Sequence, residues 1–211
     1  EEERWVAARE EMVEGTIVAR GVKDQAVIAA MRAVPRHLFV PSDIIDYAYY
    51  DDPLPIGYGQ TISQPYIVAL MSELLAVKPG DRVLEVGTGS GYQAAVLAAM
   101  GVEVYSVEII PELARSADVR LKELGYRVQV AQRDGYYGWP EHAPYQAIVV
   151  TAAPDHIPQP LVNQLAEGGR LVIPVGPPGL FQVLWLVERH GEEVTSRQIM
   201  GVRFVPLTGE H

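Results

Sequence analysis

From residue 64 onward, short apolar runs alternate with longer stretches in which apolar residues recur at helical spacing. Strands that alternate with helices predict a parallel, doubly wound sheet, whose ligand lies outside the carboxyl ends of the strands. The pattern predicts helices over 65–77, 92–100, 111–124 and 158–166, the last stopped by Gly168-Gly169, and strands over 82–86, 102–107, 127–131, 147–150 and 171–175.

The two ends of the chain follow other patterns. Helical spacing over 3–20 and 24–34 predicts two helices, the second with Asp24 as N-cap and Pro35 as its stop. A loop-rich passage follows over 35–65. Near the other end, the alternation over 181–188 and 194–200 predicts an antiparallel hairpin. We therefore expect a single α/β domain, 1–211, with a Rossmann-like, mostly parallel sheet; its parts are the N-terminal helical and acceptor-loop region 1–64, the cofactor-binding core 65–175 and the C-terminal antiparallel strands 176–211.

Composition narrows the class of protein. The chain has 211 residues, 48% of them hydrophobic, which suits one globular domain with a substantial core. It has no cysteine, which excludes a disulfide scaffold, cysteine-ligated metal and a thiol nucleophile. The net charge of −10 argues against a nucleic-acid partner. No apolar stretch is long enough to cross a membrane, and Glu1–Glu3 stands where a signal peptide carries positive charge, so we expect a cytoplasmic protein.

The glycine-rich turn after the strand 82–86 is the strongest local signal. It reads Gly87-Thr88-Gly89-Ser90-Gly91 and leads into a helix, so its backbone N–H groups can approach a ligand closely. The dinucleotide pattern G-x-G-x-x-G is not met, and the acid Glu85 precedes the turn. An acid there repels pyrophosphate but pairs with an ammonium group. This favours S-adenosylmethionine over NAD, although a purely structural turn is the alternative.

Two more acids follow the next two strands. Glu108 lies where a carboxylate can hold ribose hydroxyls. Asp134 can accept a hydrogen bond from an adenine amino group, and Gly135 lets the ring approach. Each acid alone is more often a solvated loop residue. Together with Glu85 they place an acid at the ends of three successive strands, and this repetition predicts a cofactor site.

The passage 55–66 comes immediately before the helix that starts at Pro65. Ser63 or Gln64 is expected at its N-cap, and for Ser63 alone capping is the more common role. The helix N-terminus also suits an anionic substrate.

Several motifs carry a resemblance to one known family. Pro35-Arg36-His37-x-Phe39-Val40-Pro41 and Leu54 to Tyr66 resemble its N-terminal signatures, and Leu84 to Tyr92 its cofactor loop. Gly168 to Gly176 and Val202 to Thr208 resemble its C-terminal ones. With these motifs the chain resembles protein-L-isoaspartate O-methyltransferases over nearly its whole length, and Leu54 to Tyr66 is the most specific of them.

The resemblance implies methyl transfer from S-adenosylmethionine to the free α-carboxylate of L-isoaspartyl, and also D-aspartyl, residues in damaged proteins and peptides. The product S-adenosylhomocysteine leaves, and the methyl ester collapses to a succinimide that reopens partly to aspartate. It implies Ser63 as the active-site residue. With the strand-end pattern, the expected cofactor residues are Gln60, Thr61, Ile62, Ser63, Glu85, Gly87, Thr88, Gly89, Gly91, Glu108, Ile109, Asp134, Gly135 and Thr208, and the expected substrate residues are Ile56, Gly57, Ser63, Val205, Pro206 and Leu207.

Methyl transfer to a carboxylate does not depend on a side-chain general acid or base. A carboxylate is already ionised at neutral pH, so its methylation needs alignment and no general base. Accordingly, none of the five histidines lies in a motif with a nucleophile or metal partner, and we expect no metal. We expect damaged proteins and peptides to be the partners of a monomer, and an acceptor peptide to bind extended along 205–207 and the loop Pro55–Gly59.

Four other functions share parts of this pattern. An NAD(P)-dependent oxidoreductase shares the sheet but requires G-x-G-x-x-G and a proton-shuttling residue. A nucleic-acid N-methyltransferase usually carries Asn/Asp-Pro-Pro-aromatic where this chain has Thr151-Ala152-Ala153-Pro154. A small-molecule methyltransferase of the same class, or a non-catalytic cofactor-binding module, needs residues 84–135 but not Gln60–Ser63.

Overall fold

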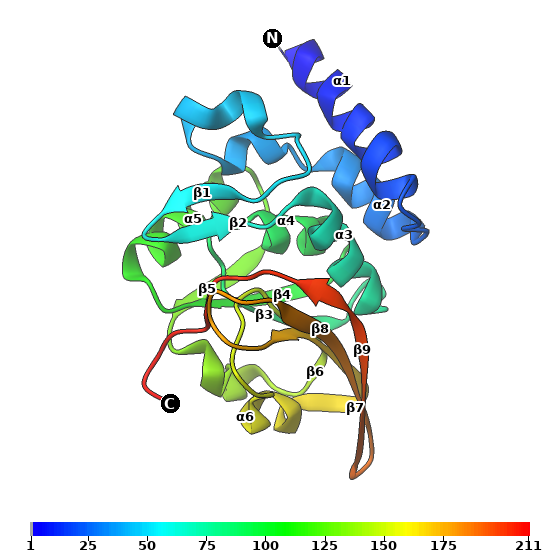
Figure 1. Ribbon diagram of the computed structural model, residues 1–211, viewed down its shortest axis with the longest axis vertical. Helices are drawn as coiled ribbons and strands as arrows, with labels where there is room; N and C mark the ends of the chain where they lie inside the picture. Colours follow the sequence, from blue (N-terminus) through cyan, green and yellow to red (C-terminus); the bar gives the residue numbers. More distant parts are fainter. Residues whose placement is uncertain (1) are drawn as a thin grey trace.

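A seven-stranded sheet is the centre of the computed structural model, which describes residues 2–211 (Figure 1). Its strand order is β5-β4-β3-β6-β7-β8-β9. The first five of these strands are parallel, and β8 and β9 are antiparallel to their neighbours. The mostly parallel sheet and the C-terminal hairpin are thereby confirmed. The strands are β3 Arg82–Val86, β4 Glu103–Glu108, β5 Val128–Gln132, β6 Tyr145–Val150, β7 Leu165–Val175, β8 Gln182–His190 and β9 Glu193–Val202.

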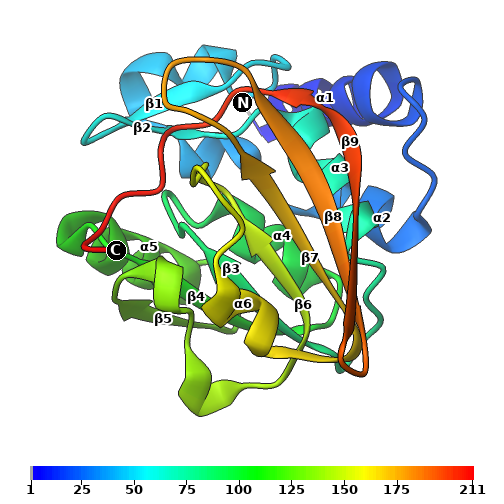
Figure 2. The same cartoon turned by 60° about the horizontal axis from the view of Figure 1, so that its bottom comes forward.

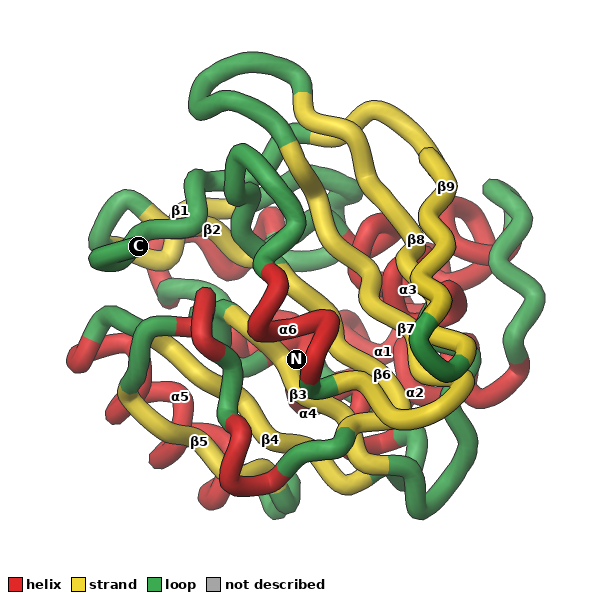
Figure 3. Tube along the Cα trace, turned by 90° about the horizontal axis from the view of Figure 1, so that it is seen from below, coloured by secondary structure: helices red, strands yellow, loops and turns green. Residues whose placement is uncertain are grey.

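Helices cover both faces of the sheet (Figure 3). Because successive strand residues point to opposite faces, β3 sends Val83 into the hydrophobic cluster under the N-terminal helices, and Leu84 into the one under α6. Within residues 2–211, no helix combines the length and apolarity needed to span a bilayer. The α-helices are α1 Glu2–Met12, α2 Gln25–Ala33, α3 Pro65–Leu74, α4 Tyr92–Ala99, α5 Pro111–Glu123 and α6 Gln159–Asn163, with a π-helical stretch Val13–Val18 and 3₁₀ turns Arg36–Phe39, Ser42–Tyr47, Gly135–Tyr137 and Pro140–His142.

Local signals at helix ends were partly right. Asp24 caps α2, since its side chain accepts hydrogen bonds from the N–H groups of Ala26 and Val27. The expected Gly168-Gly169 helix stop was wrong. Both glycines lie inside β7, which already begins at Leu165, and α6 ends earlier.

A small hairpin occupies part of the expected loop between 35 and 65. Its strands are β1 Leu54–Gly57 and β2 Gln60–Ile62, joined through Tyr58 and Gly59, both with positive φ. The strands are only four and three residues long and contain proline and glycine, so they carry no clear alternation. Figure 2 shows the hairpin and the red segment after β9 passing close to each other at the same end of the sheet.

Arg36 fastens this irregular region to the rest of the fold. Its side chain is fully buried and donates hydrogen bonds to the carbonyl oxygens of Ala48 (2.7 Å), Ser63 (2.8 Å) and Asp52 (3.4 Å). The guanidinium also lies over the ring of Tyr92, 4.9 Å from its centre. Burial lowers the pKa of Arg36. The side chain thus satisfies carbonyls in the non-strand segments on either side of the hairpin.

Replacement of Arg36 by methionine is expected to lower the free energy of unfolding by about 2–6 kcal/mol, because two short hydrogen bonds to buried carbonyls are lost. Urea titration measures the change. Arg197→Met, on the exposed part of β9, is the matched control and should change stability by less than about 0.5 kcal/mol. Equal midpoints for the two variants would contradict the anchoring role.

Candidate active site at the strand ends

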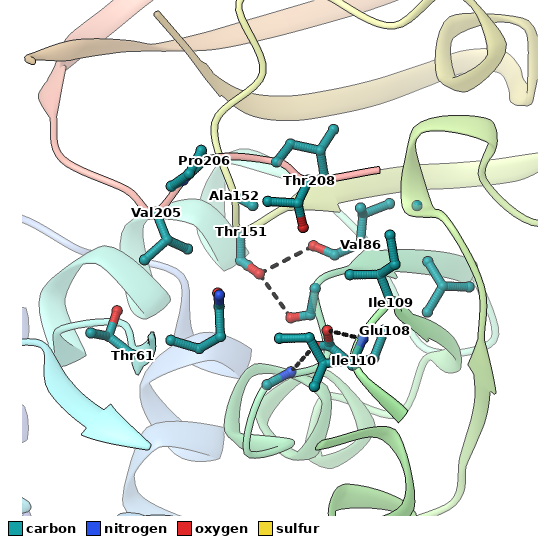
Figure 4. A pocket seen from close by; sticks show the side chains of 16 residues that line it. Thr61, Val86, Glu108, Ile109, Ile110, Thr151, Ala152, Val205, Pro206 and Thr208 are labelled. Atoms are coloured by element: carbon teal, nitrogen blue, oxygen red, sulfur yellow. Dashed lines mark hydrogen bonds between the residues drawn. The ribbon is translucent and has the colours of Figure 1, made fainter. Parts of the chain in front are cut away.

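A cleft opens at the carboxyl ends of β3, β4 and β6, where parallel α/β sheets bind ligands. We call it the main cleft. Figure 4 shows Thr61 reaching it from β2 and Val205 and Pro206 from the segment after β9. Its lining residues are Gln60, Thr61, Val86, Gly87, Gly89, Val107, Glu108, Ile109, Ile110, Gly135, Thr151, Ala152, Val205, Pro206, Leu207 and Thr208.

The glycine turn has no room for a side chain at its start. Gly87 has φ +97°, and a Cβ there would lie 2.5 Å from the hydroxyl oxygen of Thr151. That hydroxyl donates to the carbonyl oxygens of Val86 (3.1 Å) and Gly87 (2.8 Å), as Figure 4 shows. The end of β6 therefore holds the turn after β3 in place.

Glu108 connects the turn to the end of β4. Its carboxylate is buried and accepts hydrogen bonds from the backbone N–H groups of Gly89 (2.9 Å) and Ile110 (3.1 Å). It also lines the main cleft (Figure 4). Carboxylate oxygens have several lone pairs each, so Glu108 retains acceptor capacity toward the cleft.

Glu85 lies deeper, beside a smaller cavity that we call the inner pocket. The pocket is shared by Glu85, the glycine turn and the chain from Thr61 to Ser63. One carboxyl oxygen of Glu85 accepts a 2.5 Å hydrogen bond from Ser106, and the other has no hydrogen-bond partner among residues 2–211. Burial raises the pKa of Glu85 to about 8, with a further contribution from Glu108 and an opposing one from Ser106.

The segment after β9 forms the opposite wall of the main cleft. Ala153 donates its N–H to the carbonyl of Val205 (2.8 Å) and accepts from the N–H of Leu207 (2.9 Å). These two bonds fix one edge of the segment to the loop after β6. All four residues from Val205 to Thr208 line the main cleft.

A third cavity lies on the other side of the chain from Thr61 to Ser63, and we call it the side pocket. Thr61 lines both the side pocket and the main cleft, so the two cavities adjoin at this residue. Gln64, not Ser63, is the N-cap of α3, and its side chain makes no capping bond; Asp51 accepts from Tyr66 N–H instead. Ser63 is therefore not a cap. The side pocket is lined by Arg20, Pro53, Thr61, Ser63, Gln64, Ile67, Met200, Gly201, Val202, Arg203 and Phe204.

Most of the expected site residues meet here. Those in the main cleft are Gln60, Thr61, Gly87, Gly89, Glu108, Ile109, Gly135, Val205, Pro206, Leu207 and Thr208. Those in the inner pocket include Ile62, Ser63, Glu85 and Thr88, whose hydroxyl contacts Ser106 at 2.6 Å.

Four expected residues line none of these cavities. Ile56 supports the glycine turn from β1, lying 3.3 Å from where a Cβ of Gly89 would be. Gly91 is the N-cap of α4, and Gly57 is exposed in the hairpin. Asp134 uses its carboxylate for the N–H groups of Tyr136 (3.0 Å) and Glu210 (3.2 Å). Its contact with adenine stays a prediction.

Five residues that line the main cleft were not predicted from the sequence: Val86, Val107, Ile110, Thr151 and Ala152. All of them lie at or just beyond the end of β3, β4 or β6. The rule that ligands bind at these strand ends would have identified Thr151 and Ala152, which follow the fourth predicted strand. Across residues 2–211 no three acidic or histidine side chains are grouped to hold a metal.

Glu85 predicts a pH-dependent stability. Its pKa rises from the usual 4.5 to about 8 on folding, so the folded chain holds the proton more tightly than the unfolded chain. The stability this proton provides is complete below pH ~4.5 and is lost as the pH rises to about 8. Glu85→Gln, which stays neutral, should therefore lose less stability between pH 5 and pH 8 than the parent in urea titrations. A parallel decline in both proteins would contradict a protonated Glu85.

Comparisons with known proteins agree with this geometry. The family model described as "Protein-L-isoaspartate(D-aspartate) O-methyltransferase (PCMT)" matches residues 7–211. The protein-L-isoaspartate O-methyltransferase of Gloeobacter violaceus is 58% identical over 200 residues, covering 94% of this chain and 98% of the relative. Protein-L-isoaspartate O-methyltransferase 1 of Cupriavidus necator is 62% identical over 191 residues, covering 89% and 73%.

Solved structures resemble the fold over almost the whole chain. A protein-L-isoaspartate O-methyltransferase superposes with a TM-score of 0.88 and 32% identity, covering 95% of this chain and 66% of the other. A putative one from Plasmodium falciparum, solved in complex with S-adenosyl-L-homocysteine, has a TM-score of 0.81 and 27% identity, covering 95% and 98%. The match of motifs, site and fold leads to one conclusion: the chain belongs to the protein-L-isoaspartate(D-aspartate) O-methyltransferase family.

Proposed function

We propose that the chain transfers the methyl group of S-adenosylmethionine to the free α-carboxylate of an isoaspartyl residue in a damaged protein or peptide. One observation carries the proposal. The stretch from Gln60 to Ser63 borders two cavities, one lined by the glycine turn and Glu108, the other lined by Ser63, and Thr61 lines both. A cofactor and an acceptor can therefore meet across Thr61. Action in the cytoplasm as a monomer, without a metal or a nucleic-acid or membrane partner, stays a prediction.

The residues of the main cleft and the inner pocket fit S-adenosylmethionine. Glu108 offers acceptor oxygens suited to the two ribose hydroxyls, and the turn after β3 exposes backbone to the ligand. The unpartnered oxygen of Glu85 is a buried acceptor of the kind that an α-ammonium group would satisfy. When bound, the cofactor supplies an electrophilic methyl group on a sulfonium. The relative from Plasmodium falciparum was solved with the corresponding product.

The side pocket supports the acceptor role of Ser63. The backbone carbonyl of Ser63 accepts a 2.8 Å hydrogen bond from Arg36, which fixes the backbone of Ser63 where the side and inner pockets meet. We assign to its hydroxyl a hydrogen bond that orients the acceptor carboxylate. No proton has to be removed from that carboxylate, so the protein contributes positioning, and none of the described residues that line the main cleft is a histidine.

The acceptor peptide is proposed to run extended along the segment from Val205 to Leu207. One edge of this segment is bonded to Ala153, which leaves the carbonyl oxygen of Pro206 on the other edge to accept a main-chain hydrogen bond; Pro206 itself has no N–H to donate. Backbone recognition does not depend on sequence, and this suits an enzyme whose substrates share only a damaged linkage. Ile56 and Gly57 are included in our proposed acceptor surface because the hairpin adjoins the glycine turn.

Paired peptides that differ only in an aspartyl or isoaspartyl linkage test the function. With labelled S-adenosylmethionine, base-labile methyl label should enter the isoaspartyl peptide alone. Ser63→Ala should lower kcat/KM about ten- to hundredfold, as expected for one hydrogen bond to a charged group, with cofactor affinity nearly unchanged. Ser196→Ala, on the exposed part of β9, is the control. Labelling of both peptides, or of neither, would refute the proposal.

Glu108 provides an independent test of the cofactor site. Glu108→Ala should weaken binding of S-adenosylhomocysteine by about 1.5–3 kcal/mol, measured by calorimetry, because a charged hydrogen-bond acceptor is removed. Glu103→Ala, at the exposed start of the same strand, should bind as the parent does. Unchanged affinity in the Glu108 variant would remove this residue from the cofactor site.

A further inference from the structure

The side pocket holds a positive charge that methyl transfer itself does not use. Arg203 directly follows β9, is exposed and lines the pocket. Its guanidinium carbon lies 4.4 Å from the ring centre of Phe181. Among residues 2–211 it has no carboxylate partner. Stacking on an aromatic ring holds such a guanidinium while leaving its N–H groups available.

The other arginine of the pocket is already neutralised. Arg20 pairs with Asp51 at 2.8 Å and lies over the ring of Tyr66. Asp51 is also occupied by Gln64 and by the N–H of Tyr66. In the described part of the chain, no aspartate or glutamate lines the side pocket. Arg203 is therefore the unbalanced charge of this cavity.

The pocket lies next to the proposed acceptor position. It shares Ser63 with the inner pocket and Thr61 with the main cleft. A side chain that enters it thus belongs to a residue close to the methylated carboxylate. The chain as a whole carries a net charge of −10, so a local cation is needed to accept an acidic group there.

We propose that Arg203 makes the side pocket a subsite for an acidic side chain next to the isoaspartyl residue of the acceptor. The inference rests on the proposed function and adds a charge preference to it. The reacting carboxylate is the less suitable partner for Arg203, because an ion pair would withdraw charge from the oxygen that attacks the methyl group. Arg203 favours peptides with an acidic neighbour. Peptides with other neighbouring residues are still accepted, because the contacts to the peptide backbone do not depend on sequence.

A peptide series tests this preference. Isoaspartyl peptides carry glutamate, glutamine or lysine on either side of the damaged residue, and kcat/KM is measured at low and high salt. With the parent protein, the glutamate peptide should exceed the lysine peptide about two- to fivefold on at least one side, as partly exposed ion pairs allow. High salt should reduce this ratio.

Variants assign the preference to one side chain. Arg203→Gln should bring the ratio close to one and leave the glutamine peptide unaffected, whereas Arg203→Lys should keep part of it. Arg197→Gln makes the same change of charge on the exposed part of β9, outside the side pocket, and should keep the full ratio.

Three results would overturn the inference: no charge preference on either side, the same loss of preference in Arg197→Gln, or an equal loss for all peptides in Arg203→Gln. The last would place the reacting carboxylate itself on Arg203. Turnover of the glutamine peptide separates this outcome from failure of the proposed function, in which no isoaspartyl peptide would be methylated by the parent protein.

Discussion

A buried guanidinium bonded to backbone carbonyls holds the acceptor side of this molecule together. Arg36 donates to the carbonyls of Ala48, Asp52 and Ser63, three points spread along a region with little regular structure. A buried charge that satisfies several carbonyls is costly to replace, because each acceptor would lose its partner at once. The position of Ser63, and with it the boundary between the cavities, depends on this one side chain.

The site itself is assembled from six stretches of the chain that are distant in sequence. The glycine turn is held from one side by Glu108 and from the other by Thr151, so β4 and β6 both fix the backbone that leaves β3. The hairpin and the segment after β9 then close the cleft over this rigid floor. The strand ends carry Glu85 and Glu108 for the proposed cofactor, and the irregular segments carry the proposed acceptor contacts together with the expected cofactor residues Gln60–Ser63 and Thr208. This division is typical of α/β folds, in which loops on a fixed sheet provide the specificity.

The sequence predicted the core better than its periphery. Strand β3 and the helix starts at Pro65, Tyr92 and Pro111 were predicted to the residue, because buried runs, glycine and proline mark them clearly. The hairpin around Tyr58 was missed because strands this short are stabilised by their surroundings and have no pattern of their own. Gly168-Gly169 was misread as a helix stop, since glycine inside a strand carries the same local signal.

Within the site, Glu108 and Gly135 are recognisable by type and position, whereas Val107 and Ile110 are indistinguishable in sequence from ordinary core residues. The role of Arg36 is visible only in the three-dimensional structure, since nothing in the adjacent sequence indicates which backbone carbonyls its side chain will contact.

The contact between Gly87 and Thr151 has an evolutionary corollary. The hydroxyl of Thr151 occupies the space that a side chain at position 87 would need, and it donates to the carbonyl oxygens of Val86 and Gly87. A larger residue at 87 would need a smaller one at 151 and would still be strained at a φ of +97°, and shrinking 151 removes the bonds that hold the turn. Both sites are therefore expected to vary little, although 64 positions separate them along the chain.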